Sequence, residues 1–272
     1  MGLILPYKTS IILTLRQLLI FFLLLVYSVS CNQQVAEEPP PPRPEKINPD
    51  PSSAFLTPAQ SINAMQLPPG YHIELVASEP EIQEPVAIVW DGNGRMYVAE
   101  MRSYMQDING TGEHLPICRI TRLEDTNDDG KMDKHTVYLD SLVLPRMMLA
   151  LDDRLVVNET YTYNMYSYRD KDGDGKADEK TLVYLNDKPD EANLEHQKSG
   201  LIWNVDNWIY VTRNPVRYRY NNGMLDVDTM PGPPGGQWGL THDSYGRLFF
   251  SSAGGETPAL NFQQNPVYGE LM

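Results

Sequence analysis

The sequence has little cysteine and little positive charge, and each shortage excludes a class of protein. Its two cysteines, Cys31 and Cys118, cannot build a disulfide scaffold. No CxxC or CxxCH motif occurs, which excludes a zinc ribbon and a covalently attached haem within this chain. With 22 Lys and Arg against 36 Asp and Glu, the net charge is −14. Binding to nucleic acid through neutralised phosphates is therefore not expected.

The chain has enough apolar material for a folded domain. Hydrophobic residues make up 41% of the sequence and aromatic residues 10%. Disordered chains combine low hydrophobicity with few aromatic residues, so this composition argues against disorder over most of the length. We therefore expect a packed core.

The first 31 residues have the order of an export signal. Lys8 and Arg16 precede the apolar run 18–26, and small residues then lead to Cys31. The run is shorter than the ~20 residues of a membrane span, and a cysteine at this place is typical of the acylated residue of a bacterial lipoprotein. We predict a lipoprotein signal peptide over residues 1–30, with Cys31 as the lipidation site and the protein tethered to a membrane on its periplasmic or cell-surface side. Ser28 departs from the usual lipoprotein pattern, so an uncleaved anchor over residues 11–29 is the alternative.

A proline-rich linker follows over residues 31–56. Its prolines, at 39–42 and around residue 50, favour extended polyproline II and predict a semi-rigid spacer. Residues 57–272 then form the predicted folded domain. Because acylation would occupy Cys31, Cys118 is predicted to be a buried thiol.

The domain begins with a short helix and continues as strands. Thr57, Pro58 and Gln60 supply an N-cap, a first-turn proline and a capping-box glutamine, so we predict a helix that ends near Met65. One unit then recurs four times: an apolar strand, a polar or glycine turn with an aspartate, and a returning strand that contains an aromatic residue. The units lie at residues 85–99, 148–157, 200–211 and 238–251, and their turn aspartates are Asp91, Asp152, Asp206 and Asp243.

The spacing of these units predicts an all-β fold, a β-propeller. The turn aspartates lie 61, 54 and 37 residues apart, close to the ~40–50 residues of a four-stranded blade with insertions. A β-sandwich would not be expected to return the same unit four times. We expect a propeller of six blades, of which this chain carries about four blade units, and therefore a sequence that is part of a longer protein.

Two acidic loops carry the pattern of calcium ligands. Each has Asp or Asn at its first, third and fifth positions, Gly at the sixth and Asp at the ninth, and the two loops start 45 residues apart. Alternating oxygen ligands, a backbone carbonyl at the seventh position and a glycine turn suit a hard cation such as Ca²⁺. The predicted metal residues are Asp125, Asn127, Asp129, Lys131 and Asp133 in the first loop and Asp170, Asp172, Asp174, Lys176 and Asp178 in the second, with both lysines contributing their carbonyls.

These loops are predicted to be calcium-binding hairpins and not EF-hands. Thr136 and Thr181 stand where an EF-hand has its bidentate glutamate, and the flanking residues read as strands. The alternative interpretation is that Asp, Asn and Gly simply form turns. Without the twelfth ligand, the calcium affinity is expected to be weak and suited to an extracellular protein.

The segment 193–213 resembles a catalytic stretch of a known enzyme family. It places His196 four residues ahead of a strand that begins at Gly200, as in soluble quinoprotein glucose and sorbosone dehydrogenases. In those enzymes a loop histidine before such a unit acts as general base beside pyrroloquinoline quinone. The resemblance implies that His196 removes the hydroxyl proton of a sugar or alcohol and that Arg213 binds a carboxylate of the quinone.

Residues 57–272 as a whole more closely resemble a family of membrane-bound dehydrogenases of Planctomycetes and Bacteroidota. The resemblance lies in residues 67–80, 98–102 and 236–242. It implies a sugar or alcohol dehydrogenase with an N-terminal propeller, HEAT-like helical repeats and a cytochrome c module whose haem c, outside this chain, accepts the electrons. Two alternatives remain open from the residues: a non-catalytic, calcium-stapled surface propeller that binds glycans or proteins, and a calcium-dependent, lactonase-like hydrolase.

Overall fold

The computed structural model describes residues 55–188, 194, 197–213, 215–230 and 239–250, together with the backbone of residues 267–268. The predicted signal peptide with Cys31, nearly all of the linker, and His196 lie outside the described residues. Within the described residues, no helix is both long and apolar enough to cross a membrane.

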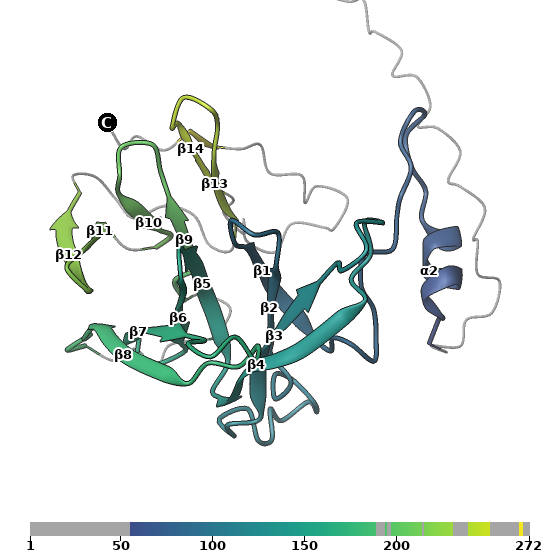
Figure 1. Ribbon diagram of the computed structural model, residues 1–272, viewed down its shortest axis with the longest axis horizontal. Coiled ribbons are helices and arrows are strands. Elements are labelled where there is room, and N and C mark those ends of the chain that lie inside the picture. Colours follow the sequence, from purple (N-terminus) through teal and green to yellow (C-terminus); the bar gives the residue numbers. More distant parts are fainter. Residues whose placement is uncertain are drawn as a thin grey trace, which may run out of the picture. The chain divides into compact units, whose positions relative to one another are not determined.

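Antiparallel strands are the main regular secondary structure of the described part of the chain (Figure 1). They form four sheets that follow one another in chain order. Sheet 1 contains β1 (Pro85–Trp90), β2 (Met96–Glu100), β3 (Cys118–Glu124) and β4 (Lys134–Leu142). Sheet 2 contains β5 (Pro145–Leu151), β6 (Arg154–Glu159), β7 (Met165–Arg169) and β8 (Glu179–Tyr184). Sheet 3 contains β9 (Gly200–Trp203), β10 (Ile209–Val211), β11 (Val216–Asn221) and β12 (Met224–Thr229). Sheet 4 contains β13 (Leu240–His242), β14 (Leu248–Phe250) and β15 (Val267–Tyr268).

The sheets are arranged as blades of a β-propeller. In each sheet every strand pairs with its neighbour in sequence, so each blade is an antiparallel meander. The first strands contact one another in succession, β1 with β5, β5 with β9 and β9 with β13, while the outer strands β8 and β12 also meet. First strands packed together with later strands further out are the defining arrangement of a propeller. The predicted all-β propeller is confirmed.

The predicted local elements are also found. The four repeated units are the hairpins β1–β2, β5–β6, β9–β10 and β13–β14. The helix α2 (Pro58–Ala64) has the predicted capping box: the Gln60 N–H donates to Thr57 Oγ1 at 3.3 Å, and the Thr57 N–H donates to Gln60 Oε1 at 2.9 Å. These two bonds satisfy backbone donors that the first helical turn would otherwise leave unpaired.

The turn aspartates of the four hairpins are not one equivalent set. Asp91 in sheet 1 and Asp243 in sheet 4 each accept hydrogen bonds from the backbone N–H and the Nε of an arginine four residues later, Arg95 or Arg247. In sheet 3 the pairing of the strands places Asn204 at the position of Asp91, and the turn of sheet 2 is only two residues long. The spacing of aspartates found the hairpins but misjudged the register of their turns.

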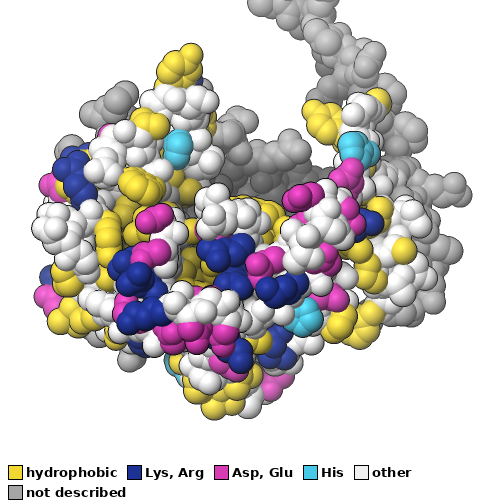
Figure 2. Space-filling view, viewed as in Figure 1, with side chains coloured by type: hydrophobic (Ala, Val, Ile, Leu, Met, Phe, Trp, Pro, Cys, Tyr) yellow, Lys and Arg dark blue, Asp and Glu magenta, His cyan; other side chains and the backbone are white. Residues whose placement is uncertain are grey.

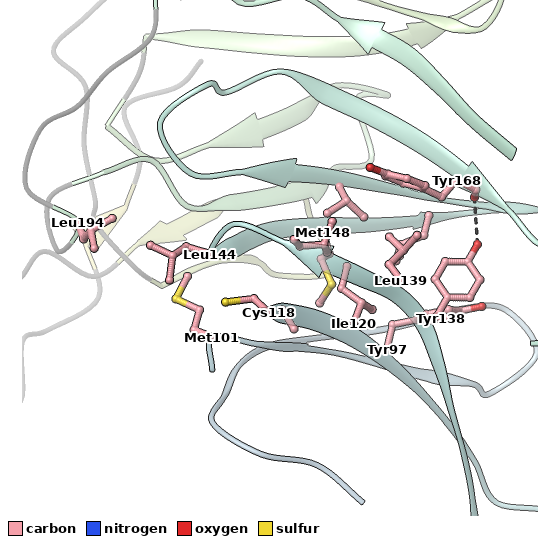
Figure 3. Close-up of a cluster of buried hydrophobic side chains, with 14 residues drawn as sticks. Tyr97, Met101, Cys118, Ile120, Tyr138, Leu139, Leu144, Met148, Tyr168 and Leu194 are labelled. Atoms are coloured by element: carbon pink, nitrogen blue, oxygen red, sulfur yellow. Dashed lines mark hydrogen bonds between the residues drawn. The ribbon is translucent and has the colours of Figure 1, made fainter. Parts of the chain in front are cut away.

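The largest described core cluster lies between sheets 1 and 2 (Figure 3). Ile120 and Cys118 from β3 share this cluster with Leu144, which directly precedes β5, and with Met148 of β5. The hydroxyl of Tyr138 donates a hydrogen bond to the carbonyl of Tyr168 at 3.0 Å across the two sheets. Cys118 is a free, fully buried thiol, as predicted.

The meander topology sorts the connections onto two faces of the propeller. One face, called here the hairpin face, carries the turns 91–95, 152–153, 204–208 and 243–247 and the acidic loops 125–133 and 170–178. The opposite crossover face carries the connections from the second to the third strand of each sheet and those that lead to the next sheet. Antiparallel strands of similar length make this alternation unavoidable.

Candidate functional site

The two acidic loops occupy the same position in successive blades. Residues 125–133 join β3 to β4, and residues 170–178 join β7 to β8. Each loop is therefore the connection between the third and fourth strands of its sheet, on the hairpin face. Strands flank both loops, in agreement with the prediction that they are hairpins and not EF-hands.

Both loops are folded by matching hydrogen bonds from backbone N–H groups to aspartate carboxylates. The N–H of the sixth residue donates to the first aspartate, from Gly130 to Asp125 Oδ2 at 2.8 Å and from Gly175 to Asp170 Oδ2 at 2.9 Å. Both glycines have positive φ, +85° and +96°, which a side chain would disfavour. The carboxylate of the fifth residue accepts a hydrogen bond from the N–H of the seventh residue, at 2.9 Å in the first loop and at 2.8 Å in the second. The repeated sequence pattern thus corresponds to a repeated loop conformation.

The second loop gathers three carboxylates. One oxygen from each of Asp170, Asp172 and Asp174 lies within 4.8 Å of the others. Asp172 and Asp174 each use one oxygen to accept a loop N–H, at 3.1 and 2.8 Å, which leaves the second oxygen of each for a cation. Oxygen ligands converging from the first, third and fifth positions are the donor set that Ca²⁺ prefers. In the first loop, Asn127 would supply an amide oxygen at the third position.

The ninth-position aspartates accept hydrogen bonds within their own loops. Asp133 accepts the backbone N–H of Thr126 at 3.1 Å and its hydroxyl at 2.8 Å. Asp178 accepts the backbone N–H of Lys171 at 3.3 Å. Each carboxylate therefore bonds to the second residue of its own loop. These bonds hold together the two ends of the loop, next to the strands.

A buried arginine that sequence reasoning did not single out contacts the second loop. Arg122 on β3 is 4% exposed and donates to Asp170 Oδ2 at 2.9 Å and to Glu124 Oε1 at 3.0 Å. Burial acts to raise the pKa of Asp170, but hydrogen bonds from the N–H groups of Gly175 and Gly173 and from Arg122 outweigh it and hold that pKa below its usual value. The carboxylate is thus ionised at neutral pH.

The loops also connect neighbouring elements. The N–H of Ala177, the eighth residue of the second loop, donates to the carbonyl of Tyr138 in β4 at 3.0 Å. The N–H of Met132, the eighth residue of the first loop, donates to the carbonyl of Val76 at the same distance. Val76 therefore accepts the same hydrogen bond from the first loop that Tyr138 of the outer strand β4 accepts from the second. Each loop fastens its blade to the element that precedes it.

Charged side chains of both signs alternate on the face seen in Figure 2. Arg169 pairs with Asp153 and Glu179, and Arg154 also binds Asp153 at 2.8 Å. These pairs are partly exposed, so each contributes little to stability. They do balance the charges of the loops and turns locally.

The crossover face carries a second polar cluster. Arg146 at the start of β5 is 3% exposed and donates from Nη2 to the carbonyl of Leu194 at 2.6 Å. Burial lowers its pKa, partly offset by the nearby tyrosines. Tyr163 donates its hydroxyl to Gln197 Oε1 at 2.7 Å, and the ammonium of Lys198 lies 4.3 Å from the centre of the Tyr163 ring. This cluster therefore holds the described residues on both sides of His196 in the sequence.

The predicted site residues divide between the two faces. All ten predicted metal residues lie on the hairpin face. Arg213 lies in the connection between β10 and β11 on the crossover face, exposed and with a φ of +54°. Of the predicted catalytic residues, the described one, Arg213, therefore lies on the face opposite the predicted metal residues. Arg146 and Tyr163 are functional candidates that sequence reasoning missed, because no local motif surrounds either of them.

Comparisons with known proteins give a family and a distant structural likeness. The model of the family described as Domain of unknown function (DUF7133) matches residues 57–270. No curated protein shows a significant match. Among solved structures, the X-ray structure of a structural genomics target predicted to be a gluconolactonase is similar at 16% identity and a TM-score of 0.42. The match covers 61% of this chain and 54% of that one, so it spans about half of the solved protein.

Proposed function

The chain belongs to the family described as Domain of unknown function (DUF7133), and we propose that its propeller binds two Ca²⁺ ions that fix the hairpin face. The observation that carries this proposal is the pair of similarly folded loops at equivalent positions in two successive blades. Asp170, Asp172, Asp174 and the carbonyl of Lys176 form the ligand set of the second loop. The first loop uses Asp125, Asn127, Asp129 and the carbonyl of Lys131.

Calcium binding would relieve charge repulsion within each loop. Carboxylates drawn together without a cation repel one another, and a divalent ion converts that repulsion into attraction. Because both loops bond to the preceding element through their eighth residue, an ordered loop also orders the contact between neighbouring elements. The cations would therefore stabilise the contact of each blade with the segment that precedes it in the chain.

Calcium is expected to raise the stability of the domain. At a free Ca²⁺ concentration of about 100 times Kd, each site adds about 2.7 kcal/mol to the free energy of unfolding. Calorimetric titration of the chelator-treated protein should give two sites, and thermal unfolding should shift to higher temperature with Ca²⁺. Asp172→Asn should reduce the number of sites to one at moderate calcium.

Asp128 offers the matched control. It is the fourth residue of the first loop, outside the proposed ligand set, with a φ of +60° that asparagine tolerates. Asp128→Asn should keep both sites. Equal unfolding temperatures with calcium and with chelator, or equal losses in the two variants, would refute the proposal.

A second function, oxidation of a sugar or alcohol, is supported by the crossover face. Lys198 and Arg213 lie in connections on the crossover face of a strongly acidic chain, and the buried guanidinium of Arg146 lies beneath the same face at the start of β5. This donor set suits an anionic cofactor with several carboxylates such as pyrroloquinoline quinone, which would supply the hydride acceptor when bound. Leu194 and Gln197, on either side of His196, are held by Arg146 and Tyr163. In this proposal His196 takes the hydroxyl proton of the substrate.

The proposed oxidation takes place at a membrane and needs an electron acceptor. Export and lipid attachment at Cys31 would hold the propeller at a membrane. A cytochrome c module elsewhere in the protein would accept the electrons. The calcium loops, on the opposite face, would serve stability in this enzyme and not the chemistry.

Replacement of the proposed base tests the reaction. His196→Ala should lower quinone-dependent dye reduction with a responsive sugar or alcohol by about 100-fold or more, the typical effect of losing a general base. His242→Ala, at the end of β13 on the hairpin face, should retain it. Dye reduction that survives His196→Ala would refute the assignment.

The two alternative functions give different results in the same assay. Hydrolysis of gluconolactone without quinone would establish the lactonase-like alternative. Calcium binding without quinone binding or turnover would favour the surface-binding propeller.

A further inference from the structure

A cavity of about 280 Å³ opens between sheets 2 and 3 on the hairpin face, away from the calcium loops' ligands and from the crossover face. The β5–β6 hairpin lines one side and sheet 3 lines the other. Its lining residues are Leu151, Asp152, Asp153, Arg154, Trp203, Asn207, Ile209 and Tyr220. The volume lies just below the range of about 300–1,000 Å³ that is typical of small-ligand sites.

The apolar wall of the cavity is an oriented indole. Trp203, the last residue of β9, is 51% exposed although Leu151 and Ile209 beside it are buried. Its Nε1 donates to Asn207 Oδ1 at 2.9 Å, which fixes the plane of the ring. The hydrogen bond thus holds a half-exposed aromatic ring in one orientation beside the cavity.

The rim of the cavity is polar and carries no excess positive charge. Arg154 donates to Asp153 at 2.8 Å and to the Tyr220 hydroxyl at 3.0 Å, so its charge is already paired. Asp152 adds a carboxylate. The rim thus disfavours anionic ligands. It offers carboxylate and amide groups that can accept and donate hydrogen bonds.

The aromatic arrangement also disfavours a cationic ligand. The Arg154 guanidinium already lies 5.7 Å from the centre of the Tyr220 ring. Only Trp203 then presents a half-exposed aromatic face, whereas recognition of an organic cation uses a cage of several rings. One flat apolar wall opposite a hydrogen-bonding rim fits a ligand that has an apolar face and a polar edge.

We propose that this cavity binds a neutral hexopyranose residue that stacks on Trp203. A pyranose ring presents C–H groups on one face and hydroxyls around its edge, and each hydroxyl both donates and accepts hydrogen bonds. The C–H face packs on the indole. The hydroxyls bond to Asp152 and to the amide of Asn207. The site is a binding subsite on the hairpin face, separate from the proposed reaction, so either can fail without the other.

The chain contains a matched control for this site. Trp90 ends β1 as Trp203 ends β9, and each pairs with a residue six positions later, Met96 or Ile209. Trp90 is also 51% exposed, but it does not line this cavity. Trp203→Ala and Trp90→Ala therefore remove the same side chain from the same strand position.

The test is a calorimetric titration of the calcium-saturated protein with glucose, galactose, mannose, cellobiose and maltose. At least one of these sugars should bind. Trp203→Ala should weaken that binding at least about tenfold, Trp203→Phe should restore part of it, and Trp90→Ala should leave it unchanged. Asp152→Asn, a change in an exposed turn, should weaken binding severalfold even if Trp203→Ala fails to fold.

Three results would overturn the proposal. They are the absence of binding by every sugar in the panel, an equal loss of affinity in Trp90→Ala, and tighter binding of choline or glucuronate than of the sugar in the panel that binds best.

Discussion

Replacing Arg122 with alanine should lower the free energy of unfolding by about 2–4 kcal/mol, somewhat less than the full cost of breaking a completely buried ion pair. Arg122 is 4% exposed and binds two carboxylates, Glu124 in its own sheet and Asp170 in the next. Removal of the guanidinium leaves both carboxylates partly desolvated and without that partner. Urea denaturation, monitored by circular dichroism, would measure the loss.

A double-mutant cycle would show how much of this loss belongs to the contact between the sheets. Asp170→Asn removes the charge of the partner, so Arg122→Ala and Asp170→Asn together should cost less than the sum of the single changes. Arg247 provides the control, because its pair with Asp243 has a half-exposed arginine. Arg247→Ala should cost less than about 1 kcal/mol. Strict additivity in the cycle would contradict the proposed link between sheets.

The same contact has a defined pH dependence. Because the pKa of Asp170 is held below its usual value in the folded state, its contribution to stability is present above the unfolded pKa of about 4. The contribution is lost as the pH falls through the lower, folded pKa. Arg122→Ala should weaken this dependence, since Arg122 supplies part of the lowering.

Alanine at Gly175 should destabilise the domain by about 2–4 kcal/mol, more than alanine at Gly130. Both glycines are the sixth residue of an acidic loop and both have positive φ, so both substitutions incur backbone strain of about 1 kcal/mol. They differ in their surroundings. A Cβ on Gly175 would lie 2.9 Å from Arg122 Nη2 and 3.0 Å from Thr136 Cγ2, whereas nothing lies within 4 Å of a Cβ on Gly130.

The clash at Gly175 is costly because Arg122 cannot move freely. A flexible arginine tip would normally swing away, but this guanidinium is buried and bonded to Glu124 and Asp170. Comparison of urea midpoints for the two variants isolates the effect of packing from that of strain. Equal destabilisation would show that Arg122 yields easily and that the loop is not packed against sheet 1 as tightly as the structure indicates.

The two glycines show which features the sequence alone could predict and which it could not. The nine-residue pattern predicted both loops, because the hydrogen bonds that fold them join residues no more than seven positions apart. It could not distinguish Gly175 from Gly130. That distinction depends on Arg122, whose partner Asp170 lies 48 residues away.

The candidate sites also divide into those formed by residues close in the sequence and those formed by distant residues. The proposed ligand set of the loops is local, so it could be proposed from the sequence alone. The crossover-face cluster joins Arg146 to Leu194 over 48 residues and Tyr163 to Gln197 over 34. The cavity beside Trp203 requires the β5–β6 hairpin to face sheet 3. No periodicity or motif in the sequence indicates that these distant residues are neighbours in the fold.

By itself, the sequence determined the helix cap, the hairpins, the acidic loops and the propeller class. Each of these depends on turn chemistry and strand patterning over a few residues, repeated at the spacing of a blade. Only the tertiary structure decided the register of the turns, the pairing of Arg122 with Asp170 and the division of the candidate residues between two faces. These features arise where blades pack against one another, and that packing energy depends on residues far apart in the chain.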